Sequence, residues 1–242
     1  MDNAAASRIA HGDLALMNPL SNPALDEAIG LLELPPAARV LDVACGRGDV
    51  LRRIAERWDV RATGYDSDPA AIAEARRRAP LADLRVADKP PEGTFELVAC
   101  VASSHALGGF PKALRALRDL VEPGGQVLLG EGYWRREPTR AYLDALGGAS
   151  ADELTSYAGL LEAAQRAGLT PLFASVATEA DWDRYEWTLI LNAERWADAH
   201  AGDPDAPVLR ERPARARARL ALPGGRETLG FALLMLRAEP NR

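Results

Sequence analysis

Residues 40–49 read Val-Leu-Asp-Val-Ala-Cys-Gly-Arg-Gly-Asp, and this stretch decides the fold. A short apolar run ends in an acid and a turn of small residues, and a helical pattern of apolar positions follows over residues 50–58. The order strand, glycine turn, helix predicts the start of a βαβ unit. Gly46 and Gly48 would let a ligand approach the backbone, and the N–H groups of the turn would offer it hydrogen bonds.

The turn departs from the dinucleotide-binding fingerprint. That fingerprint, G-x-G-x-x-G, would need a third glycine at position 51, where the chain has Leu51. Asp42, at the end of the strand, would repel a pyrophosphate but suits a ligand that carries an ammonium group. The stretch therefore favours a cationic ligand over a dinucleotide.

With these residues the chain resembles the class I S-adenosylmethionine-dependent methyltransferases, whose first motif reads roughly (V/L)-L-D-x-G-C-G-x-G. Ala44 stands where the family usually has glycine, and alanine suits that position if its φ stays negative. Two later stretches also match family patterns: residues 94–102 (F-D-x-V-x-x, with Glu96 for Asp) and residues 121–128 (L-x-P-G-G-x-L-L).

The resemblance implies an α/β fold with a Rossmann-like, doubly wound sheet of seven strands. The sheet would be mostly parallel with an antiparallel last strand, and helices would cover both faces. The alternation of predicted strands and helices supports this arrangement independently.

One methyltransferase domain is expected over residues 1–242. Its predicted parts are a helical lid (1–34), a cofactor-binding core (35–180), a helical insertion (181–227) and the last strand (228–238). Helices are predicted over 151–167 and near 181–200 and 205–220, and the Ala/Arg-rich last of these is expected to be exposed to solvent.

The resemblance also implies S-adenosyl-L-methionine as cofactor, with S-adenosyl-L-homocysteine as product. Asp42 would act at the amino group, and Gly46 and Gly48 would approach the methionine part. Asp66, at the tip of the second strand, would bind the ribose diol, although a solvated turn acid is the alternative. The remaining expected contacts are Asp88 at the adenine amine, Ser67 on the other side of the adenine, and Ala44, Lys89 and Val101.

Residues after the fourth and fifth predicted strands are candidates for the chemistry. His105 and Glu131 are candidate general bases, needed only if the nucleophile arrives protonated; His105 alternatively only shapes the pocket. Tyr133 and Trp134 are expected to line the acceptor pocket, or else to be core aromatics under a loop.

The N-terminal segment has two interpretations. It closes over the cofactor as a lid, with His11 and Asn18 contacting the acceptor, or it only covers the sheet. The resemblance favours the lid, because many small-molecule methyltransferases of this class close an N-terminal segment over the active site.

Composition narrows the class of protein. The chain has 242 residues and a formal net charge of −6, which argues against a nucleic-acid surface. Two cysteines, Cys45 and Cys100, and no leader-like N-terminus favour a reducing, cytoplasmic location. We find no metal-ligand cluster and no membrane-spanning run, and expect a monomer or homodimer.

Three functions are compatible with these features. Methyl transfer to a small-molecule acceptor is preferred. An RNA or protein methyltransferase is the alternative, disfavoured by the acidic balance and because Val-Ala-Ser-Ser at 101–104 replaces an Asn/Asp-Pro-Pro-Tyr-type motif. A non-catalytic cofactor-binding protein is the third, supported only by Ala44.

Overall fold

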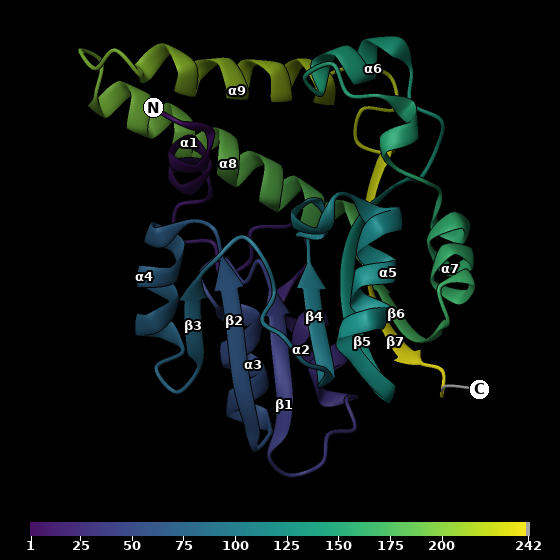
Figure 1. The fold of residues 1–242 in the computed structure, drawn as a ribbon. Coiled ribbons are helices and arrows are strands. Elements are labelled where there is room, and N and C mark those ends of the chain that lie inside the picture. Colours follow the sequence, from purple (N-terminus) through teal and green to yellow (C-terminus); the bar gives the residue numbers. More distant parts are fainter. Residues whose placement is uncertain (241–242) are drawn as a thin grey trace. The chain divides into compact units, whose positions relative to one another are not determined.

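A seven-stranded sheet organises the protein (Figure 1). The computed structural model describes residues 1–240. The strands, in chain order, are β1 (Ala38–Val43), β2 (Val60–Asp66), β3 (Asp83–Val86), β4 (Phe95–Val101), β5 (Val121–Trp134), β6 (Leu169–Val176) and β7 (Leu229–Ala238). Their spatial order is β3-β2-β1-β4-β5-β7-β6. The β1–β2, β1–β4, β2–β3 and β4–β5 pairs are parallel and β6–β7 is antiparallel, which confirms the predicted fold class.

Helices follow most of the strands. They are α1 (Asn3–His11), α2 (Asn22–Gly30), α3 (Asp49–Arg57), α4 (Pro69–Arg78), α5 (Phe110–Leu120), α6 (Arg140–Ala145), α7 (Tyr157–Arg166), α8 (Glu179–Ala199) and α9 (Ala206–Leu220), with 3₁₀ turns η1 (Ser104–Leu107) and η2 (Ala151–Glu153). In Figure 1, α5 lies in front of the sheet and α3 behind it. The parallel strands therefore have helical cover on both faces, as buried parallel sheets require.

Strand β1 forms the centre of the core. Val40, Leu41 and Val43 are fully buried between β2 and β4. The register pairs Asp42 with Gly64 of β2 and with Ala99 of β4. Since the strands are parallel, the loops after β1, β2 and β4 meet at one edge, which is where ligands bind in open α/β sheets.

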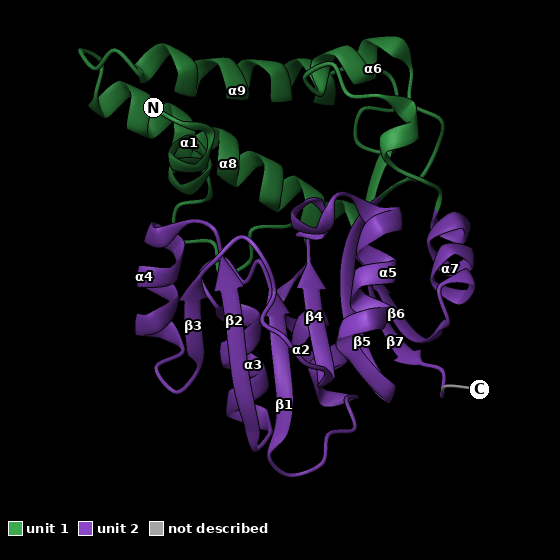
Figure 2. Cartoon of the chain, in the orientation of Figure 1, with its two compact units in different colours: residues 1–19, 133–156, 177–230 green, residues 20–132, 157–176, 231–242 purple. Residues whose placement is uncertain are grey.

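The chain forms two compact units (Figure 2). Unit 1 consists of residues 1–19, 133–156 and 177–230, and unit 2 consists of residues 20–132, 157–176 and 231–242. Unit 2 holds nearly all of the sheet. In unit 1, α1 and α9 pack against α8 through small side chains that include Ala6, Ala10, Ala193, Ala197 and Ala206. Helix α1 of the predicted lid and helices α8 and α9 of the predicted insertion therefore share one hydrophobic core.

Two local predictions were wrong. The helix predicted over 151–167 is broken: η2 ends at Glu153, and α7 begins at Tyr157. The intervening backbone is extended because Thr155 accepts a hydrogen bond from the Trp134 N–H at 2.8 Å and Ser156 pairs with the end of β5. The motif at residues 121–128 implies a Pro-Gly-Gly turn ahead of the fifth strand, but this stretch lies inside β5, at a register shift opposite β4.

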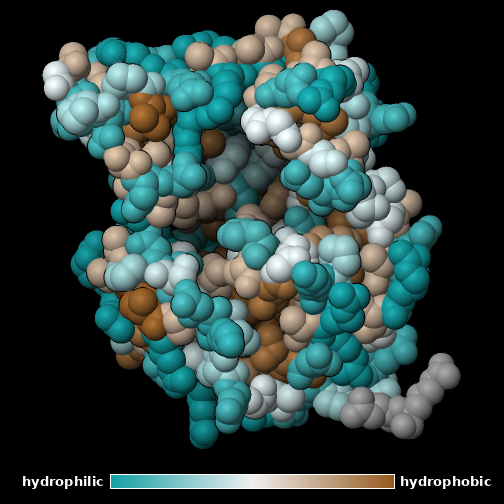
Figure 3. All heavy atoms as spheres, turned by 45° about the horizontal axis from the view of Figure 1, so that its top comes forward, coloured by the Kyte–Doolittle hydropathy of each residue, from teal (hydrophilic) through white to brown (hydrophobic). Residues whose placement is uncertain are grey.

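On the face shown in Figure 3, hydrophilic residues (teal) cover most of the area, and hydrophobic residues (brown) gather in patches among them. Arginines of the Ala/Arg-rich helix α9 pair with acids: Arg210 with Asp198 and Arg217 with Glu194. Within residues 1–240, no helix has the length and apolar composition that crossing a bilayer demands.

Candidate functional site

Asp66 ends β2 and holds the glycine turn. Its Oδ2 accepts a hydrogen bond from the Gly46 N–H at 2.9 Å, and its Oδ1 accepts one from the Asp68 N–H at 2.9 Å. Both bonds come from backbone, so the carboxylate is fixed in orientation while each oxygen keeps further lone-pair capacity for a ligand. The neighbouring Asp68 caps α4 by accepting a hydrogen bond from the Ala70 N–H at 2.9 Å.

Asp42 is a buried acid with an unused oxygen. The side chain is 3% exposed, and Oδ2 has no hydrogen-bond partner among residues 1–240. Burial, and then the charge of Asp66, raise the pKa of Asp42 to about 8. Burying a charge is costly without a partner, so the carboxyl is poised to ionise when a cation or N–H donor arrives. This fits the predicted contact with an amino group.

The turn after β1 has a left-handed backbone at Ala44, where φ is +48°. The condition under which alanine suits this position, a negative φ, is therefore not met. The turn brings the Cys45 N–H to the Tyr65 carbonyl at 2.9 Å, which ties it to the end of β2. A left-handed alanine costs roughly 1–2 kcal/mol, so the usual glycine of the family has a physical reason here.

Gly48 serves helix packing. Its φ is +75°, and a Cβ at this position would lie 3.0 Å from the Ala75 Cβ of α4. The sequence singled out Gly48 for close ligand approach but missed this contact. Gly46, with φ +52°, donates its N–H to Asp66 and forms the part of the turn nearest that carboxylate.

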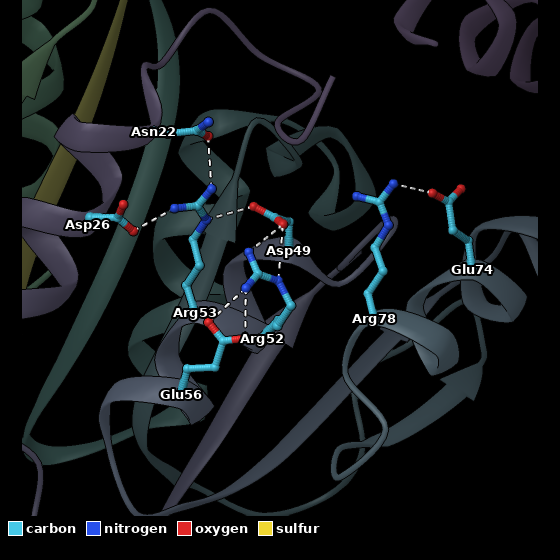
Figure 4. A network of polar contacts seen from close by, with 8 residues as sticks. All are labelled: Asn22, Asp26, Asp49, Arg52, Arg53, Glu56, Glu74 and Arg78. Atoms are coloured by element: carbon cyan, nitrogen blue, oxygen red, sulfur yellow. Dashed lines mark hydrogen bonds and ion pairs between the residues drawn. The ribbon is translucent and has the colours of Figure 1, made fainter. Parts of the chain in front are cut away.

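Asp49, at the first position of α3, is a second feature that the sequence did not single out (Figure 4). The side chain is 7% exposed and accepts hydrogen bonds from Arg52 and Arg53, and Arg53 also binds Asp26 and Asn22 of α2. A carboxylate in the first turn offsets the positive helix N-terminus.

The other predicted cofactor residues lie in loops at the same edge. Ser67 follows β2 and is exposed, as are Asp88 and Lys89 after β3, and Val101 is half-buried at the end of β4. The loops after β2 and β3 lie together, because the Ala87 N–H donates a hydrogen bond to the Asp66 carbonyl at 3.0 Å. Their contacts with a cofactor stay predictions.

The two candidate bases differ in environment. Glu131, in β5, is 8% exposed, and its Oε2 has no partner among the residues described. Burial raises the pKa of Glu131. Hydrogen bonds from Ser104 and from the Gly132 N–H lower this pKa, but by less than burial raises it. His105 is exposed in η1. A buried carboxyl with a raised pKa and a free acceptor atom has the properties of a general base.

The predicted acceptor residues lie in unit 1 and have structural partners there. His11 lies with Nδ1 2.7 Å from the Ser7 carbonyl and Nε2 2.9 Å from the Tyr185 hydroxyl. Trp134 donates its indole N–H to the Ala151 carbonyl at 2.8 Å. A Cβ at Gly230 would collide with the Tyr133 ring, and Asn18 is buried and engaged. These contacts agree with core roles and leave contact with an acceptor a prediction.

A buried ion pair in unit 1 was missed altogether. Arg219, expected on an exposed helix, is only 5% exposed and donates to Glu186 Oε1 at 2.5 Å and to the Tyr142 hydroxyl at 3.0 Å. The Ala/Arg alternation gave no sign that one arginine of this run faces inward. Glu186 is its partner on α8, 33 residues away.

Comparisons with known proteins agree with this geometry. The model of a methyltransferase domain family matches residues 40–125. YjhP of Escherichia coli, an uncharacterised protein, is 28% identical over 84% of this chain and 86% of its own. Its crystal structure superposes with a TM-score of 0.87 over 97% of this chain and 99% of that chain.

Two further relatives are methyltransferases by name. A SAM-dependent methyltransferase from Thiobacillus denitrificans, solved with S-adenosyl-L-homocysteine, is 27% identical with a TM-score of 0.87 and covers 99% of both chains. A ubiquinone biosynthesis O-methyltransferase of Pseudomonas aeruginosa is 34% identical over 55% of this chain and 58% of its own length.

The sheet order and the acid-lined glycine turn define a Rossmann-like methyltransferase fold. The family match over residues 40–125 and the full-length structural relatives support a class I S-adenosylmethionine-dependent methyltransferase.

Proposed function

We propose that the protein transfers the methyl group of S-adenosylmethionine to a nucleophilic atom of a small organic acceptor. The observation that carries the cofactor assignment is the buried, unpartnered carboxyl oxygen of Asp42 beside the anchored carboxylate of Asp66. Together these acids suit a ligand with an ammonium group and a diol. The relatives' cofactor and product support the same assignment.

A small acceptor is supported by two observations. The chain carries a formal net charge of −6, and Arg210 and Arg217 of α9 are paired with acids, which disfavours RNA as the acceptor. The Pseudomonas relative is named for ubiquinone biosynthesis, a small-molecule pathway.

Each proposed role follows from position. Asp42 holds the amino group, Gly46 faces the methionine part, Asp66 holds the ribose, and the exposed loop residues Ser67 and Asp88 hold the adenine. The sulfonium supplies an already activated methyl group. The protein's task is then to align the nucleophile and exclude water, and such positioning is worth roughly 7–11 kcal/mol of barrier.

Glu131 is the base in this proposal. Its unpartnered Oε2 accepts the proton of an acceptor hydroxyl or amine, and its raised pKa makes it a better acceptor than an ordinary carboxylate. His105, being exposed, shapes the entrance. The two cysteines, both unpaired, accord with the cytoplasmic location that we propose.

Calorimetric titration with S-adenosylhomocysteine tests the first half of the proposal, and we expect micromolar binding. Formation of S-adenosylhomocysteine from S-adenosylmethionine is then followed with a panel of small phenols, amines and carboxylic acids, and with bulk RNA. We expect turnover with a small acceptor and none with RNA. A folded protein that fails to bind contradicts the cofactor assignment, and turnover with RNA alone contradicts the small acceptor.

The Glu131→Gln variant tests the base. It keeps the shape of the side chain, so S-adenosylhomocysteine should bind as in the wild type, while turnover of a hydroxyl or amine acceptor falls by roughly 10²–10⁴-fold. Unchanged turnover in this variant would remove Glu131 from the chemistry.

A further inference from the structure

Arg47 lies between the two glycines of the turn after β1, and its side chain is buried. Only 6% of it is exposed, although arginine is rarely buried unless its charge is paired. Its Nε lies 3.3 Å from Glu74 Oε2, on α4. The turn that is proposed to face the methionine part of the cofactor is therefore joined to α4 by an ion pair.

A second contact joins the same two elements one residue further along each. Gly48 packs against Ala75 so closely that a Cβ at position 48 would lie 3.0 Å from the Ala75 Cβ. This packing prevents the turn from coming nearer to α4, and the ion pair of Arg47 with Glu74 resists its moving away. Together the two contacts fix the distance between the turn and the helix.

Helix α4 begins directly after the residues proposed for the ribose and the adenine. Asp66 and Ser67 precede Asp68, which caps the helix. The Asp68 N–H donates to Asp66 Oδ1 at 2.9 Å, so the proposed ribose ligand is held on the α4 side by a bond that does not involve the turn. The ion pair between Arg47 and Glu74 thus links the methionine end of the proposed site to the element that follows its ribose end.

Glu74 has a second arginine partner. It pairs with Arg78, one turn further along α4, as Figure 4 shows. That pair lies within one helix and does not involve the turn. Arg47 is buried whereas 29% of the Arg78 side chain is exposed, so solvent screens the pair with Arg47 less. The two partners of one carboxylate therefore allow the effect on the turn to be separated from the effect on the helix.

We infer that Arg47 is a positioning residue for the cofactor: its ion pair with Glu74 holds the glycine turn at the distance from α4 at which the turn contacts the methionine part. Arg47 acts through the backbone of the turn. Because Asp66 is held separately, loss of the ion pair should weaken binding of the methionine part more than binding of the adenosine part. This role rests on the proposed function, since it requires S-adenosylmethionine in this turn.

Two ligands distinguish these parts of the site. S-adenosylhomocysteine carries the amino-acid part, and 5′-methylthioadenosine lacks it but keeps the ribose and the adenine. The ratio of their dissociation constants measures what the amino-acid part adds to binding, and a general loss of folded protein does not change it. Titration calorimetry of the full chain measures both constants.

Glu74→Met is the test variant, because methionine keeps the length and helix propensity of the side chain but carries no charge. We expect it to weaken binding of S-adenosylhomocysteine by about fivefold or more, and binding of methylthioadenosine by less than about twofold. Arg47→Gln breaks the same ion pair from the other side and should lower the ratio as well.

Arg78→Met is the matched control, because it removes the other partner of Glu74 and leaves Arg47 paired. It should leave the ratio at its wild-type value. An unchanged ratio in Glu74→Met overturns the positioning role, and so does an equal fall in Arg78→Met. A folded wild type that binds neither compound contradicts the cofactor assignment itself. A wild type that binds both equally contradicts only the contact of the turn with the methionine part, and the role of Arg47 with it.

Discussion

The Asp66 carboxylate and the Gly46 N–H lie 2.9 Å apart, so the acid that ends β2 holds the turn that follows β1. The same side chain is the proposed ribose ligand. Binding of the ribose and the shape of the turn at the methionine end are therefore coupled through one carboxylate. The neighbouring acid, Asp68, has a different task at the N-terminus of α4.

Replacing Asp66 with alanine should weaken binding of S-adenosylhomocysteine by roughly 10- to 100-fold, because hydrogen bonds to a charged group contribute about 1.5–3 kcal/mol. Titration calorimetry measures the change. Asp68→Asn is the control, since asparagine caps a helix as well as aspartate does. Affinity in Asp66→Ala equal to that of Asp68→Asn would remove Asp66 from the site.

Ala44→Gly should stabilise the protein by about 1 kcal/mol. Ala44 has φ +48°, and glycine adopts a left-handed backbone without the steric penalty. Urea unfolding measures the free energy. Ala55→Gly, inside α3, is the matched control and should destabilise by about 1 kcal/mol, because its backbone is helical. A loss of stability in both variants would contradict the strain at Ala44.

Much of the fold followed from periodicity and turn chemistry. The strand and the helix predicted around residues 40–58 are β1 and α3, and the antiparallel last strand, predicted over 228–238, begins within one residue of that position, at Leu229. These elements are specified by local apolar runs bounded by turns. The helix predicted over 151–167 failed because Thr155 and Ser156 pair with Trp134, a tertiary contact that local pattern does not encode.

Burial of charge was the main feature that the sequence did not reveal. Asp49 and Arg219 are both buried and both paired: Asp49 binds Arg52 and Arg53 of its own helix, and Arg219 binds Glu186 on α8. The acids at the strand ends, Asp42 and Asp66, were found because their positions follow from the strand–turn pattern itself. Positions fixed by topology were thus predictable, and side-chain pairings were not.

Glu186→Gln should destabilise unit 1 by roughly 3–5 kcal/mol, since it leaves the buried guanidinium of Arg219 without a counter-charge. Glu194→Gln, on the same helix, is the control. Its partner Arg217 is 44% exposed, and loss of a surface pair costs about 0–1 kcal/mol. Thermal and urea unfolding measure the loss of stability in both variants. An equal loss in the two would show that burial does not set the strength of the Glu186–Arg219 pair.

The pKa of Asp42 predicts how stability depends on pH. It is about 8 in the folded protein against an ordinary value of 3.8, so between these values the folded state binds one proton more than the unfolded chain. The contribution of Asp42 to the free energy of unfolding is therefore fully present below pH 3.8. It is lost as the pH rises towards 8, by up to about 1.4 kcal/mol per pH unit. Asp42→Asn cannot ionise and lacks this dependence.

Urea unfolding of the wild type and Asp42→Asn at several pH values from 5 to 8 isolates this group, because other titrating residues cancel in the difference between them. We expect the wild type to lose stability relative to the variant as pH rises. Binding of S-adenosylhomocysteine near pH 7 should release a proton from the wild type, since an ammonium group favours the ionised carboxylate. Calorimetry in buffers of different ionisation enthalpy measures that release, and Asp42→Asn should abolish it. A pH-independent difference in stability would mean that Asp42 is already ionised in the free protein and has a partner that offsets its burial.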